Sequence, residues 1–211
     1  MGRHVAARRP RTFRRVRAVL AGALVLGVGA TMTLAAWTDT EFASGSFTAS
    51  RFDTESNADG SGWASNINPP VATFTAATGM SPTVSKFTTL DVRTTATTSV
   101  SGSVLLTATG KTGTLGDVLE YRVVRAATTS STCDSTAFTN GSAVFVAGNN
   151  ATTPVYVTGG TMPTTPPSQT IAAAGGLLRY CFDVRIKAGT AMSYQGATGT
   201  LTWTFTSTSA N

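Results

Sequence analysis

Residues 178–187 read LRYCFDVRIK, and this stretch decides the fold class. Apolar and polar side chains alternate along its whole length, and the apolar series is Leu178, Tyr180, Phe182, Val184 and Ile186. A repeat of two residues places the two series on opposite faces of an extended chain. The stretch therefore predicts a β-strand with one face buried in a core and the other face polar.

Other parts of the chain repeat this pattern in shorter pieces. Leu201, Trp203 and Phe205 alternate with threonines near the C-terminus. Further strands are expected at residues 86–93, 100–108, 118–125, 144–147 and 154–158, with glycine and asparagine turns between them. Many short strands without an amphipathic helix predict an all-β fold, a two-sheet antiparallel sandwich.

Two stretches are expected to form loops. Residues 54–70 are rich in Asn, Asp, Gly and Ser and lack an apolar face. Residues 158–169 contain three prolines, and proline has no N–H to donate to a central ladder.

The positive charge of the sequence is concentrated before Ala18. Seven of the 16 Lys and Arg residues are arginines in this stretch, and no acidic residue precedes Asp39. The remaining nine basic residues face ten acidic ones, which gives the rest of the chain a formal charge of −1. A chain this close to neutrality lacks the basic surface that nucleic acids bind, so no nucleic-acid partner is expected.

A basic segment followed by an uncharged apolar run is typical of an export signal. The run spans residues 18–38, and small side chains at Thr33 and Ala35 suit a signal peptidase that cuts between Ala35 and Ala36. The sequence thus predicts a cleavable N-terminal signal helix within residues 1–35 and a secreted protein that meets the membrane only before cleavage. The run is also long enough to span a bilayer, so an uncleaved membrane anchor is the alternative.

The exported part has the length of one domain. We expect an extended segment at residues 36–53, followed by a β-sandwich at residues 54–211. Cys133 and Cys181 are expected to form a disulfide, because an exported chain folds in an oxidising environment. Cys181 belongs to the polar series of its strand, so the disulfide is expected to hold a surface loop without crossing the core.

The sequence offers no arrangement of catalytic side chains. The only histidine, His4, lies in the signal and leaves with it, which removes Ser/His/Asp, Cys/His and HExxH chemistry together. Asp53, Glu55 and Asp59 are interpreted as a solvated loop and not as the carboxylate pair of a glycosidase or a calcium site. We therefore expect a protein that is not an enzyme, with no catalytic, cofactor-binding or metal-binding residues.

Both ends of the exported part resemble one known family. After Ala35 and Ala36 come Trp37, Thr38 and Asp39, then a segment rich in Phe, Thr, Ala and Gly at residues 45–49. Near the C-terminus a YQG turn, residues 194–196, precedes the closing strand with Trp203. Between them, residues 80–106 resemble a proline-containing turn and two strands. On these motifs the chain resembles the TasA/camelysin (CalY) family over most of residues 30–206.

The resemblance implies export through a SipW-type signal peptidase, a jelly-roll-like sandwich and a structural role at the cell surface or in the biofilm matrix. In such fibres the new N-terminal segment completes the sheet of the next copy in a head-to-tail homopolymer. The side chains expected to fill the acceptor groove are Trp37, Phe42, Phe47 and Phe52.

Alternatives to fibre formation stay open at this point. The N-terminal segment can instead pair within its own subunit as a first strand. The protein can also be a monomeric surface adhesin or glycan-binding β-sandwich, anchored in the membrane if the signal is uncleaved. Camelysin is classed as a metalloprotease, but the exported part has no histidine to form such a site.

Overall fold

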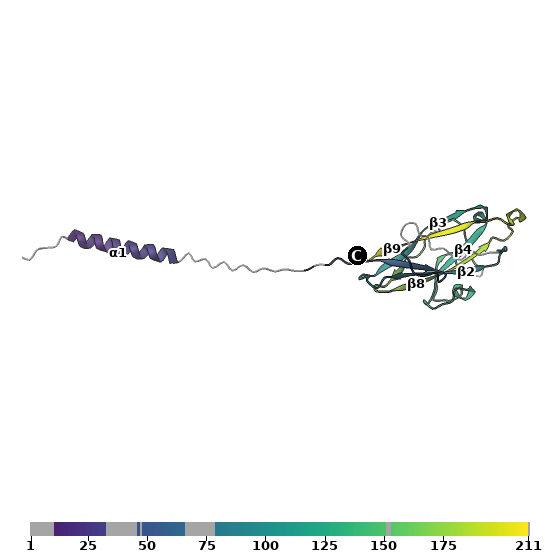
Figure 1. Ribbon diagram of the computed structural model, residues 1–211, viewed down its shortest axis with the longest axis horizontal. Coiled ribbons are helices and arrows are strands. Elements are labelled where there is room, and N and C mark those ends of the chain that lie inside the picture. The colour runs from purple at the N-terminus through teal and green to yellow at the C-terminus, as the bar shows by residue number, and fades with distance from the viewer. Residues whose placement is uncertain (1–10, 33–45, 47, 66–78, 151–152, 211) are drawn as a thin grey trace, which may run out of the picture. The chain divides into compact units, whose positions relative to one another are not determined.

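The computed structural model describes residues 11–32, 46, 48–65, 79–150 and 153–210 of the 211-residue chain (Figure 1). The chain divides into two compact units, Met1–Phe47 and Thr48–Asn211. Helix α1 (Arg11–Met32) belongs to the first unit. Within the described ranges no helix is both long enough and apolar enough to cross a membrane.

Several residues singled out in the sequence fall outside the described ranges. They are the expected cleavage pair Ala35 and Ala36 and the candidate anchors Trp37, Phe42 and Phe47. The expected boundary between residues 53 and 54 lies inside the second unit, which begins at Thr48.

The second unit consists mainly of two antiparallel sheets packed face to face, so the prediction of an all-β, two-sheet antiparallel fold is confirmed (Figure 1). In order across the larger sheet, the strands are β1 (Thr54–Ala58), β2 (Lys86–Thr94), β8 (Leu177–Ile186), β4 (Leu119–Arg125) and β5 (Val144–Ala147), with β6 (Val157–Thr158) also paired to β4. The smaller sheet has the order β7 (Gln169–Ile171), β3 (Gly102–Thr112) and β9 (Thr200–Ser209). In the described ranges three short 3-10 helices lie between strands: η1 (Thr114–Asp117), η2 (Ser135–Phe138) and η3 (Met192–Tyr194).

The core lies between the two sheets and contains aromatic rings from both of them. Trp203 of β9 packs on Phe182 of β8, with ring centroids 4.8 Å apart, and Phe205 packs on Tyr180 at 4.6 Å. Tyr121 of β4 meets the edge of Trp203 at 5.4 Å. Such pairs contribute about 1 kcal/mol each beyond the area that they bury. The alternating series predicted in residues 178–187 and 201–205 therefore contributes side chains to the core from both sheets.

The expectation of a loop over residues 54–70 is wrong for its first part. Residues 54–58 form the edge strand β1, which pairs with β2 in an antiparallel register. An edge strand needs few apolar side chains, and here Ala58 is the one that enters the core. The three-residue strand β7 was also not predicted. The proline-containing loop predicted at residues 158–169 is confirmed for residues 159–168, whereas its two end residues belong to β6 and β7.

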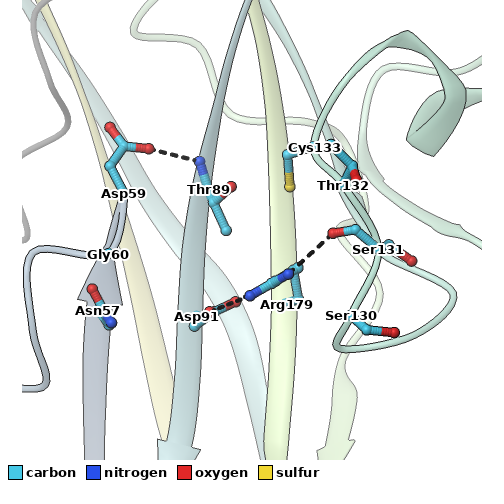
Figure 2. Close-up of a pocket in the computed structure, with 10 residues that line it drawn as sticks. All are labelled: Asn57, Asp59, Gly60, Thr89, Asp91, Ser130, Ser131, Thr132, Cys133 and Arg179. Carbon is cyan, nitrogen blue, oxygen red and sulfur yellow. Dashed lines mark hydrogen bonds and ion pairs between the residues drawn. The ribbon is translucent and has the colours of Figure 1, made fainter.

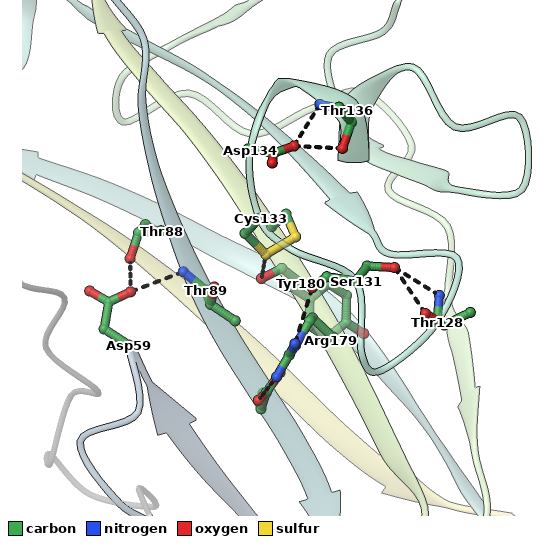
Figure 3. Close-up of a disulfide and its surroundings, with 12 residues drawn as sticks. Asp59, Thr88, Thr89, Thr128, Ser131, Cys133, Asp134, Thr136, Arg179 and Tyr180 are labelled. Atoms are coloured by element: carbon green, nitrogen blue, oxygen red, sulfur yellow. Dashed lines mark hydrogen bonds and ion pairs between the residues drawn. A yellow bond between two sulfur atoms is a disulfide. The ribbon is translucent and has the colours of Figure 1, made fainter.

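A second, smaller apolar cluster covers the outer face of the larger sheet. The segment 126–143, called here the cover segment, folds onto this face and buries Phe138 against Val124 and Phe87. The predicted disulfide is confirmed, with the Cα atoms of Cys133 and Cys181 5.1 Å apart (Figure 3). It lies on the outer face, as the polar series predicts. Cys181 is nevertheless completely buried, because the cover segment lies over it.

Candidate functional site

Charged side chains on the outer face of the larger sheet form a ladder of cross-strand ion pairs. In four cases an acidic and a basic residue are direct partners in the strand register: Glu55–Arg93, Asp91–Arg179, Glu120–Arg185 and Asp183–Arg122. Their N–O distances lie between 2.6 and 2.8 Å. These pairs fix the register of β1, β2, β8 and β4, because a slip by one residue would separate every pair.

The most deeply buried pair belongs to a larger polar cluster. Asp183 accepts hydrogen bonds from Nη2 of Arg122 at 2.6 Å and from the hydroxyl of Tyr156 at 2.7 Å. The Tyr156 ring lies beside two guanidinium groups, with its centroid 4.5 Å from Cζ of Arg122 and 3.5 Å from that of Arg185. Burial, together with the hydrogen bond to Asp183, raises the pKa of Tyr156. The cluster thus keeps its charges paired within the fold.

A polar hollow of about 580 Å³ opens on the same outer face (Figure 2). Its floor is formed by strands β2 and β8, one wall by the end of β1 and its turn, and the other wall by the cover segment. The lining residues are Asn57, Asp59, Gly60, Thr89, Asp91, Ser130, Ser131, Thr132, Cys133 and Arg179. No sequence pattern marks this hollow, because four separate segments contribute to it.

Hydrogen bonds hold the floor of the polar hollow and its cover-segment wall in place. Arg179 makes two hydrogen bonds of 2.8 Å to the carboxylate of Asp91 and a third, of 3.1 Å, from Nη1 to the carbonyl of Ser131. The hydrogen bonds to Asp91 raise the pKa of Arg179. The disulfide fixes the same wall at Cys133.

The opposite wall of the polar hollow depends on Asp59. This residue adopts a left-handed backbone conformation with φ of 49°, which is costly for a residue other than glycine. Its carboxylate accepts a hydrogen bond of 3.0 Å from the amide of Thr89 and another from the hydroxyl of Thr88. These bonds hold the turn over β2.

The polar hollow suits a ligand with many hydroxyl groups, because hydroxyl, amide and carboxylate groups line it. Its lining combines donors and acceptors, and the guanidinium of Arg179 compensates the charge of Asp91. Among the described residues no group of three His, Cys, Asp or Glu side chains could hold a metal ion. Asp53 and Glu55 are ion-paired with Arg51 and Arg93, and Glu55 lies in strand β1 and not in a loop.

Strand β9 is the second candidate surface. In the described part of the chain it pairs with β3 alone and forms one edge of the smaller sheet. Its ten residues, TLTWTFTSTS, contain no charge, no proline and no glycine. Natural edge strands are usually short, charged or interrupted, because an unprotected edge recruits other strands. A long uncharged edge is therefore the feature of this fold best suited to strand addition.

The chain enters the sandwich at the end where β9 finishes. The backbone of Arg51 bonds to Ser99 through both its N–H and its carbonyl, each at 2.9 Å. The amide of Ala210, just after β9, bonds to the carbonyl of Ser101 at 2.8 Å. We call this the entry end of the sandwich.

Phe52 is the one candidate donor anchor that the structure describes. Its ring packs against the core of its own chain, beside Gly102. A side chain at Gly102 would come within 2.6 Å of the ring, which explains a glycine there. Phe52 thus seals the entry end of its own sandwich, and the remaining candidate anchors precede Thr48. No protein-family model and no curated protein matches this chain.

Proposed function

We propose that the protein is a secreted, non-enzymatic structural protein of the cell surface or biofilm matrix that assembles into fibres by strand donation. The observation that carries the proposal is the uncharged ten-residue edge of β9. Residues 36–47 of one copy add to this edge in the next copy. The partner is therefore a further copy of the same chain.

The lengths of the donor and of the acceptor edge are compatible. At about 3.3 Å per residue, the twelve residues 36–47 extend over about 40 Å, and the ten residues of β9 over about 33 Å. Addition satisfies backbone hydrogen-bonding groups along the edge and places alternate side chains on the sheet. Because donor and acceptor are different surfaces, the contact does not close on itself and propagates as a filament.

Export is part of the same proposal. The arginine-rich start of the chain and the uncharged run that follows it support a signal removed between Ala35 and Ala36 by a SipW-type peptidase. The Cys133–Cys181 disulfide supports folding in an oxidising compartment. A jelly-roll-like connectivity is proposed for the sandwich on the resemblance to the TasA/camelysin family. Mass spectrometry of the secreted protein tests the cleavage site, since an N-terminus other than Ala36 contradicts it.

Electron microscopy of two purified forms tests the assembly. Residues 36–211 are expected to form filaments, and residues 48–211 are expected to stay monomeric. Both forms keep Phe52 and the contacts of Arg51 with Ser99, so the folded unit is matched. Filaments formed by residues 48–211, or monomers from both forms under all conditions that keep the disulfide, contradict strand donation.

The polar hollow favours a second candidate function, a monomeric adhesin that binds neutral glycans. The test is titration of residues 36–211 with maltohexaose, cellohexaose and chitohexaose. Ser130→Trp places a bulky ring at the rim of the hollow and should abolish binding. Ser142→Trp, elsewhere on the exposed part of the cover segment, is the matched control. Equal binding by the two variants, or binding by neither variant nor the parent, excludes this site.

A further inference from the structure

Different parts of the chain lie at the two ends of the smaller sheet. Strand β9 runs from Thr200, beside the loop 187–199, to Ser209 at the entry end. The amide of Leu115 bonds to the carbonyl of Thr198, which ties that loop to the end opposite the entry (Figure 1). The chain thus enters at one end of the sandwich, and β9 begins at the other.

If copies follow one another along the strand axis, this placement fixes the chain direction of the donor segment relative to β9. A donor segment leaves its own sandwich at the entry end and meets the next copy at that copy's loop 187–199. Followed from residue 47 back to residue 36, it then passes Thr200 first and Ser209 last. Its chain direction is therefore opposite to that of β9. Antiparallel pairing is also slightly more stable per residue than parallel pairing.

The positions of the aromatic residues in the donor segment decide which face of the added strand turns toward the core. In a regular strand Trp37 and Phe47 share one face, and Phe42 lies on the other, because side chains alternate with a period of two. Leu201 and Phe205 of β9 pack against the core, whereas Thr200 and Thr208 are exposed. A register that puts two aromatic rings on the core side therefore pairs even-numbered donor residues with even-numbered residues of β9.

From these relations we infer that residues 36–47 pair antiparallel with β9 of the next copy, with Ser46 near Thr200 and Thr38 near Thr208. The inference rests on the proposed strand donation and names its acceptor, direction and face. Trp37 and Phe47 then lie on the core side of the added strand. Phe52 takes no part, because its own chain already holds it.

Cross-linking of mixed copies tests this arrangement. Both native cysteines are in the disulfide, so an introduced thiol is the only free one. Copies of residues 36–211 with Ser46→Cys or Thr38→Cys are mixed with copies carrying Thr200→Cys or Thr208→Cys and treated with a short bismaleimide. All four positions carry a small hydroxyl side chain, so the variants are closely matched. Filament formation by each mixture is checked by electron microscopy.

The expected result is a cross-linked dimer from the pairs Ser46/Thr200 and Thr38/Thr208, and several-fold less from the two swapped pairs. Filaments that cross-link only in the swapped pairs overturn the antiparallel direction. Filaments that cross-link in no pair overturn β9 as the acceptor. Absence of filaments in the parent chain as well overturns the proposed function itself, so the failures are distinguishable.

Discussion

Arg122 and Asp183 lie directly opposite each other on β4 and β8, and their side chains form an almost fully buried ion pair with an N–O distance of 2.6 Å. The Asp183 side chain is 0% exposed and that of Arg122 is 8% exposed. Isolated charges at such a depth would be strongly unfavourable, so each one requires the other. The pair therefore specifies which residues of β4 and β8 face each other.

Removing one partner of this pair should destabilise the protein severely. Asp183→Ala leaves a buried guanidinium without its carboxylate and should lower the free energy of unfolding by about 3–5 kcal/mol. The double variant Arg122→Met/Asp183→Leu should recover most of that loss, because two apolar side chains need no partner. Urea unfolding of both variants measures the difference. Equal losses in the single and the double variant would show that the charge itself is not the cause.

Two buried tyrosines should make stability fall at alkaline pH. Burial raises the pKa of Tyr121 to about 12 and raises that of Tyr180 further. In the unfolded chain both tyrosines ionise near pH 10. Above this pH, deprotonation therefore stabilises the unfolded state before it can occur in the folded state. The free energy of unfolding should therefore fall between about pH 10 and pH 12, by up to about 1.4 kcal/mol per pH unit for each tyrosine. Urea unfolding at a series of pH values measures this slope, and a flat profile would contradict it.

The same two tyrosines should respond differently to removal of the hydroxyl at neutral pH. Among the described residues the buried hydroxyl of Tyr180 has no hydrogen-bond partner, whereas that of Tyr121 donates to the carbonyl of Thr161 at 2.7 Å. Tyr180→Phe should be neutral or slightly stabilising, and Tyr121→Phe should cost about 1 kcal/mol. Thermal unfolding of the two variants decides this, and the reverse order would be inconsistent with the contacts.

The disulfide should stabilise the fold and hold down the cover segment. Closing a loop over a sequence separation of 48 contributes about 4 kcal/mol in the chain-entropy model. Cys133→Ser/Cys181→Ala should lose about that much and should become sensitive to chymotrypsin after Phe138, which is 1% exposed. The oxidised parent is the control. Unchanged cleavage at Phe138 in the variant would show that packing alone holds the segment.

Phe52 should stabilise a single folded unit even when no neighbour is present. Phe52→Ala in residues 48–211 should lower the free energy of unfolding by about 2–3 kcal/mol, because the ring is partly buried against the core. Chemical unfolding measures this loss. An unchanged stability would instead assign Phe52 to the contact between copies.

The sequence predicts the central strands well because each has one face in the core. Residues 178–187 show this clearly, since Tyr180 and Phe182 enter the core and Arg179 and Asp183 lie on the other face. The edge strand β1 escaped prediction because its side chains are almost all polar. The burial of Cys181 cannot be predicted from its own strand either. The polar face of β8 is covered by the cover segment, which comes from a distant part of the chain.

The candidate surfaces are likewise predictable from the sequence only in part. The uncharged alternation of residues 200–209 is visible in the sequence, but its position at an edge depends on which strands pair. The ion-pair ladder depends on the register between strands, and no single segment encodes a register. The polar hollow combines Asn57, Asp91 and Ser131 from three segments, so only the folded chain brings them together.

Hydrogen exchange of β9 tests strand donation most directly. Amide exchange is followed by mass spectrometry in residues 36–211 after assembly and in residues 48–211. About half of the β9 amides, those that point away from β3, should exchange more slowly in the assembled form, because an added strand gives them partners. Unchanged exchange in β9 after assembly, or new protection confined to β1 at the edge of the larger sheet, would contradict the account.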